Sequence, residues 1–216
     1  MKLCYICGSS GKLTKDHVPP KNLFPDPKPS DLITLSCCDK CNNGFAMDDE
    51  AFRIFVASVI NRSAAGDRAW KEGVVASSFA RSPKLRGNVA KSLVPVSIET
   101  PEGRVELTGL TFPQERGDRY LTRLTKGLLS HFYPQVSHSD AVFEINQLLI
   151  THEIHDDVLS RLAYDERGEQ VFRFWRGFSD DEGQINSLWV FVFYDALAFT
   201  VDVTGLSIRV DAAVTE

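Results

Sequence analysis

Four of the five cysteines form two pairs that have the spacing of metal ligands. Cys4 and Cys7 are the first C-x2-C pair, and Cys38 and Cys41 are the second, with thirty residues between the pairs. Such pairs are typical of a tetrahedral zinc site, because each tight turn directs two thiolates toward one ion. We therefore expect these four residues to hold a structural zinc ion, with Cys37 left over.

Reduced buried thiols or a redox pair are the alternative interpretations of the cysteines. All five lie within the first 41 residues, whereas disulfides of a secreted protein would be expected to span more of the chain. The sequence has no apolar run of about 20 residues that would cross a membrane, and its N-terminus does not resemble a signal peptide. We expect a cytoplasmic protein without a membrane partner.

Asp16 and His17, between the two cysteine pairs, are the residues best suited to catalysis. A histidine titrates near physiological pH and can take a proton from water, and a carboxylate suits a hard cation such as Mg²⁺. Neighbouring side chains of a strand point to opposite faces, so the two can act together only where the backbone bends. Val18-Pro19-Pro20 predicts such a bend. Alone, an Asp-His dipeptide is a weak signal.

The order of these motifs resembles the HNH endonuclease signature. Cys4-x2-Cys7-Gly8 precedes Leu13-Thr14-Lys15-Asp16-His17-Val18-Pro19, and Cys38-x2-Cys41-Asn42 follows. The similarity covers about residues 4–45, one fifth of the chain. It implies that residues 1–46 form a zinc-stapled ββα-metal module in which the zinc ion only holds the scaffold together.

The resemblance also implies the roles of the site residues. His17 would be the general base that activates water, and Asp16 and Asn42 would hold one catalytic Mg²⁺ or Mn²⁺ near the scissile phosphate. The implied activity is hydrolysis of phosphodiester bonds in nucleic acid, with DNA as the expected substrate. The residue types agree with this chemistry, which needs an activated water and a cation to neutralise developing charge.

Two positions depart from the pattern of the family. Asp31 stands in the place of its middle Asn, unless Asn22 serves instead, and a carboxylate cannot donate the amide hydrogen bond of an asparagine. Many relatives also carry a basic residue after the final Asn or His, where this chain has Gly44-Phe45-Ala46. The alternative is therefore a zinc-knuckle module that binds nucleic acid or protein without catalysis, and a third interpretation is a structural adaptor.

The elements that must position these residues are short. Residues 12–17 and 32–35 are expected to be strands, and five prolines between Pro19 and Pro29 exclude a regular element from the loop between them. After the second cysteine pair, acidic residues followed by apolar residues at helical spacing predict a helix over about 48–62.

Residues 47–216 are expected to form an α+β body of helices and a mostly antiparallel sheet. A second helix is predicted over about 118–133, where leucines fill one face. A hairpin is predicted around Tyr194-Asp195-Ala196, between two strongly β-prone runs. The strand-like runs of this part are 93–99, 104–111, 142–151, 170–178, 188–193 and 197–203.

The charge of the chain is unevenly distributed. The net charge is −5, yet residues 1–130 contain 19 Lys and Arg against 14 Asp and Glu, whereas residues 131–216 contain 5 against 15. The first part could therefore meet a polyanion, while the acidic, β-rich part over 140–216 could bind a partner protein or form a homodimer. A solubility gradient without any partner is the alternative.

Five basic residues are candidates for contacts with nucleic acid. Lys15 and Lys21 lie in the N-terminal module, and Arg119, Arg123 and Lys126 follow i, i+4, i+7 on the second predicted helix, so these three share one face. Such a ridge would contact phosphates and add affinity that depends on salt but not on base sequence. A solvated helix face is the alternative interpretation.

Overall fold

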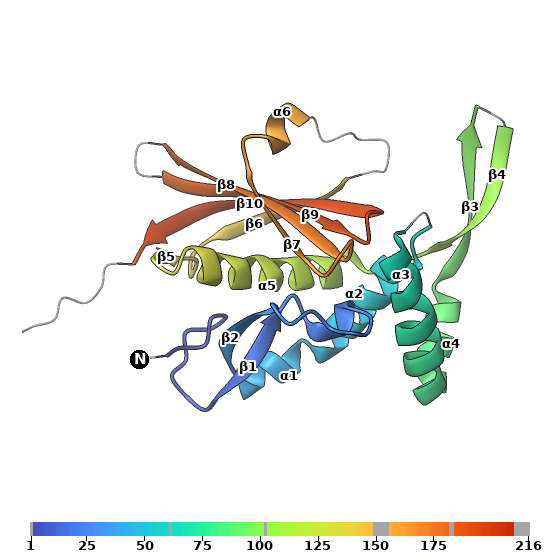
Figure 1. Ribbon diagram of the computed structural model, residues 1–216, viewed down its shortest axis with the longest axis horizontal. Coiled ribbons are helices and arrows are strands. Elements are labelled where there is room, and N and C mark those ends of the chain that lie inside the picture. Colours follow the sequence, from blue (N-terminus) through green and yellow to red (C-terminus); the bar gives the residue numbers. More distant parts are fainter. Residues whose placement is uncertain (1, 61, 102, 149–155, 182–183, 210–216) are drawn as a thin grey trace, which may run out of the picture.

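The computed structural model of the protein describes residues 2–60, 62–101, 103–148, 156–181 and 184–209. Its elements confirm an α+β fold, in which a sheet, a central helix and an N-terminal hairpin lie in successive layers (Figure 1). The central helix is α5 (Gln114–Phe132). No helix in these ranges is long and apolar enough to cross a membrane.

The N-terminal hairpin consists of β1 (Leu13–Val18) and β2 (Ile33–Cys38), which pair antiparallel. Both predicted strands are present, and the second continues into the cysteine pair. The proline-rich loop between them contains one short 3₁₀ turn, η1 (Lys21–Leu23), where we expected no regular element. α1 (Asp39–Gly44) follows β2 directly, so the chain order is strand, strand, helix.

Two long helices correspond to those predicted from the sequence. α2 (Ala46–Ser58) ends earlier than predicted, and α5 begins earlier, directly after Pro113. Proline suits that place because its fixed φ and missing N–H cost little at a helix start. Between α2 and α5 lie α3 (Ala64–Arg68), the π-type helical turns of η2 (Ala69–Phe79), α4 (Pro83–Lys91) and a projecting hairpin of β3 (Leu93–Thr100) and β4 (Gly103–Leu110) (Figure 1).

The C-terminal part forms an antiparallel sheet in the order β5-β10-β9-β8-β7, with β6 also paired to β10. The predicted hairpin joins β9 and β10, and Tyr194 and Asp195 in its turn have φ of 52° and 58°. The predicted strand over 142–151 is described only to Leu148. The strands are β5 (Val136–Ser137), β6 (Val142–Leu148), β7 (Ala163–Arg167), β8 (Phe172–Asp181), β9 (Gln184–Phe193) and β10 (Leu197–Ile208), with α6 (Asp156–Leu159) before β7.

One continuous hydrophobic core joins the N-terminal module to the rest of the protein. It contains Tyr5 and Val18 from the module, Phe52 from α2 and Phe172 from β8, and it crosses the boundary expected between residues 46 and 47. At Gly127, α5 approaches β1 so closely that an added Cβ would lie 2.8 Å from both γ carbons of Val18. A glycine at this point of α5 therefore sets how closely the helix holds the hairpin.

Candidate zinc centre and active site

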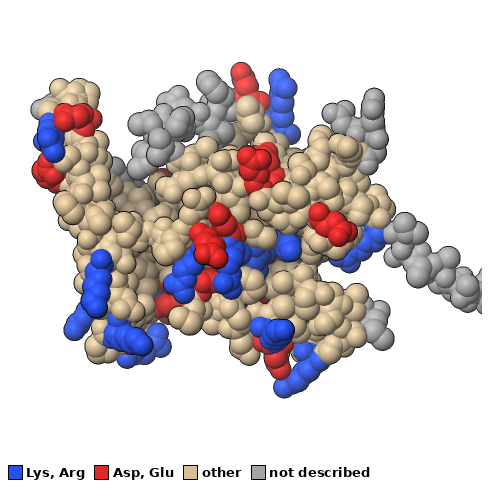
Figure 2. All heavy atoms as spheres, turned by 180° about the vertical axis from the view of Figure 1, so that it is seen from behind, with Lys and Arg blue, Asp and Glu red and all other residues tan. Residues whose placement is uncertain are grey.

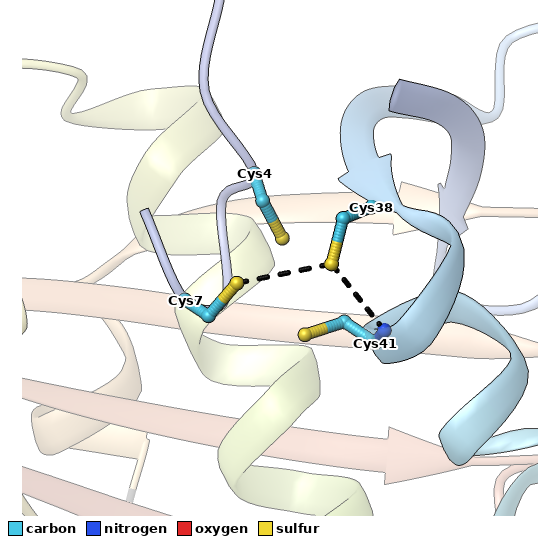
Figure 3. Close-up of side chains that lie close together, drawn as sticks. All are labelled: Cys4, Cys7, Cys38 and Cys41. Carbon is cyan, nitrogen blue, oxygen red and sulfur yellow. Dashed lines mark hydrogen bonds between the residues drawn. The ribbon is translucent and has the colours of Figure 1, made fainter. Parts of the chain in front are cut away.

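The thiols of Cys4, Cys7, Cys38 and Cys41 converge on one point (Figure 3). Their four Sγ atoms all lie within 4.8 Å of one another. Four sulfurs that bind zinc at about 2.3 Å each would be about 3.8 Å apart in a tetrahedron, and the Sγ atoms of Cys7 and Cys38 are 3.8 Å apart. The predicted cluster is confirmed, and its geometry fits a metal ion such as zinc.

Two local turns direct these thiols. In the first, the N–H of Gly8 donates to the carbonyl of Cys4 at 2.8 Å, and Gly8 has a φ of 72°, which favours glycine. In the second, Cys38 is the N-cap of α1, and its Sγ accepts a hydrogen bond from the N–H of Cys41 at 3.4 Å. The end of β2 and the start of α1 therefore form the second half of the cluster.

Cys37 lies outside the four-thiol cluster. It is fully buried, and its Sγ is 3.9 Å from that of Cys4. Successive strand residues point to opposite faces, so Cys37 packs in the core while its neighbour Cys38 reaches the cluster.

The Asp16 carboxylate is buried and engaged on both oxygens. Arg123 Nη2 donates to Oδ1 at 2.8 Å and to Oδ2 at 2.7 Å, and the Tyr5 hydroxyl donates to Oδ2 at 2.7 Å. Asp16 is 5% exposed and Arg123 is 4% exposed. The predicted role of Asp16 as a ligand of Mg²⁺ or Mn²⁺ does not fit this geometry, because a guanidinium already pairs with the carboxylate.

The prediction that Arg123 belongs to an exposed, phosphate-contacting ridge is wrong. Its guanidinium lies 4.9 Å from the ring centroid of Phe45, and its Nη1 donates to Asp49 Oδ1 at 2.6 Å. Arg123 thus connects β1, through Asp16, with α2, through Asp49. Helical spacing predicts the face that it shares with Arg119, but not that α2 and the hairpin cover the middle of this face.

The Arg123 guanidinium pairs with two carboxylates, those of Asp16 and Asp49. Burial raises the pKa of Asp49 to about 6, even though Arg123 opposes the shift. The charge of Asp16 adds to the increase, because a second anion disfavours ionisation of Asp49. We define Tyr5, Asp16, Asp49 and Arg123 as the buried network.

His17 follows Asp16 on β1 but lies outside the buried network. Its side chain is partly buried and lines a small pocket with Tyr5 and Pro20. Burial lowers the pKa of His17, and the charges of Lys21 and Lys15 lower it further against the opposing charge of Asp16. The neutral imidazole, which can accept a proton, is therefore the main form at pH 7.

Asn42 connects α1 to β1. Its Nδ2 donates to Thr14 Oγ1 at 3.1 Å, and that hydroxyl donates to the Cys37 carbonyl at 3.0 Å. Across the described residues, no hydrogen bond joins Asn42 to Asp16 or His17. Asp16 and Asn42, which the resemblance groups in one site, therefore have different hydrogen-bond partners.

Among the residues that the structure describes, neither candidate for the middle Asn position forms a hydrogen bond with His17. Asp31 is exposed, with Oδ2 4.0 Å from the Nε of Arg167 on β7. Asn22 forms a side-chain hydrogen bond with Glu50 on α2. Through these contacts the loop between β1 and β2 interacts with β7 and α2.

The other predicted basic contacts remain accessible. Lys15, Lys21 and Arg119 are exposed and Lys126 is partly buried. Arg119 and Lys126 line an open groove of about 540 Å³ along α5, although Arg119 also lies 3.1 Å from Asp48.

Sequence reasoning missed Tyr5 and Asp49 as members of the buried network. Tyr5 lies between Cys4 and Cys7 of the first cysteine pair, and no sequence pattern distinguishes it. The sequence predicts only a helix-start role for Asp49, although two consecutive carboxylates, Asp48 and Asp49, favour a cation nearby. Comparisons of the chain with protein-family models, with curated proteins and with solved structures found no match.

Proposed function

We propose that the protein is an HNH-type nuclease that hydrolyses phosphodiester bonds in nucleic acid, with DNA as the expected substrate. The observation that carries this proposal is the position of His17. It lies near the end of β1, in a hairpin that the four-thiol cluster joins to α1, and Lys15 and Lys21 act on it electrostatically.

In this proposal His17 takes a proton from the attacking water. Its lowered pKa keeps it in the basic form at pH 7. Lys15 and Lys21 attract the phosphate and offset negative charge that grows on its oxygens. A zinc ion at the four cysteines holds the hairpin in place and takes no part in the reaction.

The resemblance also implies a catalytic Mg²⁺ or Mn²⁺, which would polarise the phosphoryl oxygens. Asp16 does not fit as its ligand, because Arg123 and Tyr5 occupy both carboxylate oxygens. We therefore assign no step to a cation held by Asp16 and Asn42.

The proposal is tested with purified protein, plasmid, linear duplex, single-stranded DNA and RNA, each with Mg²⁺, with Mn²⁺ and without added cation. We expect cleavage that falls at least about 100-fold in His17→Ala, because general bases commonly contribute that much or more. His131→Ala, which removes an exposed histidine of α5, is the matched control and should cleave normally. Undiminished cleavage by His17→Ala protein with intact zinc content and circular dichroism would remove His17 from the mechanism.

Nucleic-acid binding without catalysis is the second candidate function. The observation that favours it is the buried pair of Asp16 and Arg123, which leaves no free carboxylate at the position that the resemblance assigns to a metal ligand. The same substrates distinguish the two functions. Binding without cleavage of any substrate, by protein that contains its zinc, would select the second.

A further inference from the structure

A broad groove of about 880 Å³ crosses the first cysteine turn, the C-terminal half of α5 and the ends of β5 and β10. The described side chains that line it include three cations and no carboxylate, although the protein as a whole has a net charge of −5. The cations are Lys2, Lys126 and Arg209, and hydroxyl groups of Ser130, Ser137 and Ser139 lie among them.

This groove continues into the groove along α5. Lys126 and Ile6 line both, and Arg119 lies further along the second. Figure 2 shows Lys and Arg side chains along the middle of one face, between the upper and lower parts of the molecule, with acidic side chains beside them at one end. The cations thus form a path and not a single point.

His138 is a buried side chain at the wall of the groove. It is 6% exposed, and its Nε2 lies 3.1 Å from Ser130 Oγ. Burial lowers the pKa of His138 to about 4, and the charges of Lys126 and Arg209 both contribute to the decrease. Two cations therefore act on one point beside a neutral pair of hydrogen-bonding groups, which is an environment that favours an anion.

We infer that this groove binds the sugar–phosphate backbone of a nucleic-acid strand, with Lys126 and Arg209 contacting phosphates and the serine hydroxyls donating to phosphate oxygens. The inference rests on the proposed function, for which it supplies the path of the substrate. Tyr5 lines both the groove and the small pocket beside His17, so a strand in the groove passes close to the proposed base.

The three cations are expected to contribute unequally. Lys2 lies in the part of the groove that Cys4 and Cys7 line. A zinc ion with four thiolates carries a net negative charge, which offsets a nearby lysine. Lys126 and Arg209 are therefore the residues to change.

The test compares two double variants that change the net charge equally. Lys126→Gln/Arg209→Gln alters the groove, and Arg86→Gln/Lys91→Gln removes two exposed cations of α4. Affinity for labelled single-stranded DNA, duplex DNA and RNA is measured by fluorescence anisotropy over a range of salt, without added Mg²⁺ or Mn²⁺. We expect the groove variant to bind at least about tenfold more weakly, with a salt slope smaller by about 1.5, and the α4 variant to change less than about twofold.

If the two variants lose affinity for nucleic acid equally, net charge alone attracts the nucleic acid, and the inference is overturned. Absence of binding by the wild-type protein to all three nucleic acids would overturn it as well. A second readout is the pKa of His138, measured by NMR titration with and without nucleic acid. The signal of His138 is identified as the one that is missing from the spectrum of His138→Gln. Phosphates beside Lys126 and Arg209 should raise this pKa, and an unchanged pKa at saturation would place the strand elsewhere.

The inference and the proposed function fail in different ways. If the groove variant binds more weakly and the wild-type protein cleaves nothing, the groove is the binding site for nucleic acid and the proposed nuclease activity is wrong. If cleavage depends on His17 and the groove variant keeps its affinity, the proposed nuclease activity is supported and the inference that the groove binds the strand is wrong.

Discussion

Two basic regions of α5 lie one turn apart, and they differ in what surrounds them. Arg123 is enclosed by Phe45, the hairpin and α2, and its charge is shared between Asp16 and Asp49. Lys126 lies at the wall of two grooves, with its Nζ 5.4 Å from the ring centroid of Phe143. The first cation holds three elements of the protein together, while the second is available to an external anion.

The difference has an energetic consequence. A buried ion pair contributes little net stability when both partners are present, but removal of one partner leaves an uncompensated buried charge and costs several kcal/mol. An exposed cation can be removed at almost no cost to stability. Variants in the buried network should therefore affect folding, whereas variants in the grooves should affect binding.

Loss of the metal is expected to have the largest effect, because the four-thiol cluster holds the hairpin that carries Asp16. Cys38→Ala removes a ligand and should abolish stoichiometric zinc binding and destabilise the protein by more than about 5 kcal/mol, since structural zinc contributes directly to folding. Cys37→Ala, the matched control, should keep one zinc per chain and lose only about 1–2 kcal/mol. Zinc content and urea denaturation check both, and equal zinc content in the two variants would contradict the cluster.

Removal of Arg123 should come next. Arg123→Ala leaves Asp16 and Asp49 buried without their cation, and we expect a loss of about 3–5 kcal/mol in the free energy of unfolding. Lys126→Ala, one turn away at the wall of the two grooves, removes a cation with no carboxylate partner among the described residues and should change it by less than about 1 kcal/mol. Similar losses in the two variants, measured by chemical denaturation, would show that the two regions do not differ as the structure indicates.

The close approach of α5 to β1 gives a third comparison. Gly127→Ala places a methyl group 2.8 Å from the γ carbons of Val18, and the resulting displacement should cost about 2–3 kcal/mol. Gly87→Ala adds the same methyl to α4, where nothing lies within 4 Å, and should stabilise the protein by up to about 1 kcal/mol. A neutral effect of Gly127→Ala on the melting temperature would contradict the close packing.

The pH dependence of stability tests how the buried network shares one cation. The pKa of Asp49 is raised to about 6 from 3.8, so between these values the folded state binds more protons than the unfolded state. The contribution of Asp49 to the free energy of unfolding therefore falls as pH rises from about 4 to about 6, by about 1–2 kcal/mol. Asp49→Asn should lack this decrease. A wild-type minus variant difference that stays constant between pH 4 and 7 would show that the pKa of Asp49 is not raised.

Salt should have the smallest effect on stability and a large effect on binding. Raising NaCl from 0.1 to 0.5 M should shift the melting temperature by less than about 2 °C, because the buried network is shielded from ions. Affinity for oligonucleotides should fall more than about tenfold over the same range. A large decrease in melting temperature at high salt would mean that the Arg123 network is open to solvent.

Local patterns in the sequence predicted much of the fold. The strands near residues 12–17 and 32–35, the helices near residues 48–62 and 118–133, and the hairpin at Tyr194-Asp195-Ala196 were all predictable from local residue patterns and turn residues. The four-thiol cluster follows from cysteine spacing. These features are local because each depends on residues within a few positions of one another, or on two tight turns that each present a pair of thiols.

The roles of individual charged residues could not be predicted in this way. Periodicity placed Arg119, Arg123 and Lys126 on one face of α5, but the partners of Arg123 lie 74 and 107 residues away in the chain. Whether a cation on that face meets solvent or buried carboxylates depends on which elements pack over it.

The sequence by itself determined the main helices and strands and the four-thiol cluster of this protein, because backbone preferences, apolar spacing and paired cysteines act over short distances. Only the tertiary structure decided that Asp16 pairs with Arg123, that His17 lies apart from it, and that Lys126 and Arg209 face one groove. The physical reason is that desolvation and ion pairing depend on three-dimensional neighbours, which α5 brings together from distant parts of the chain.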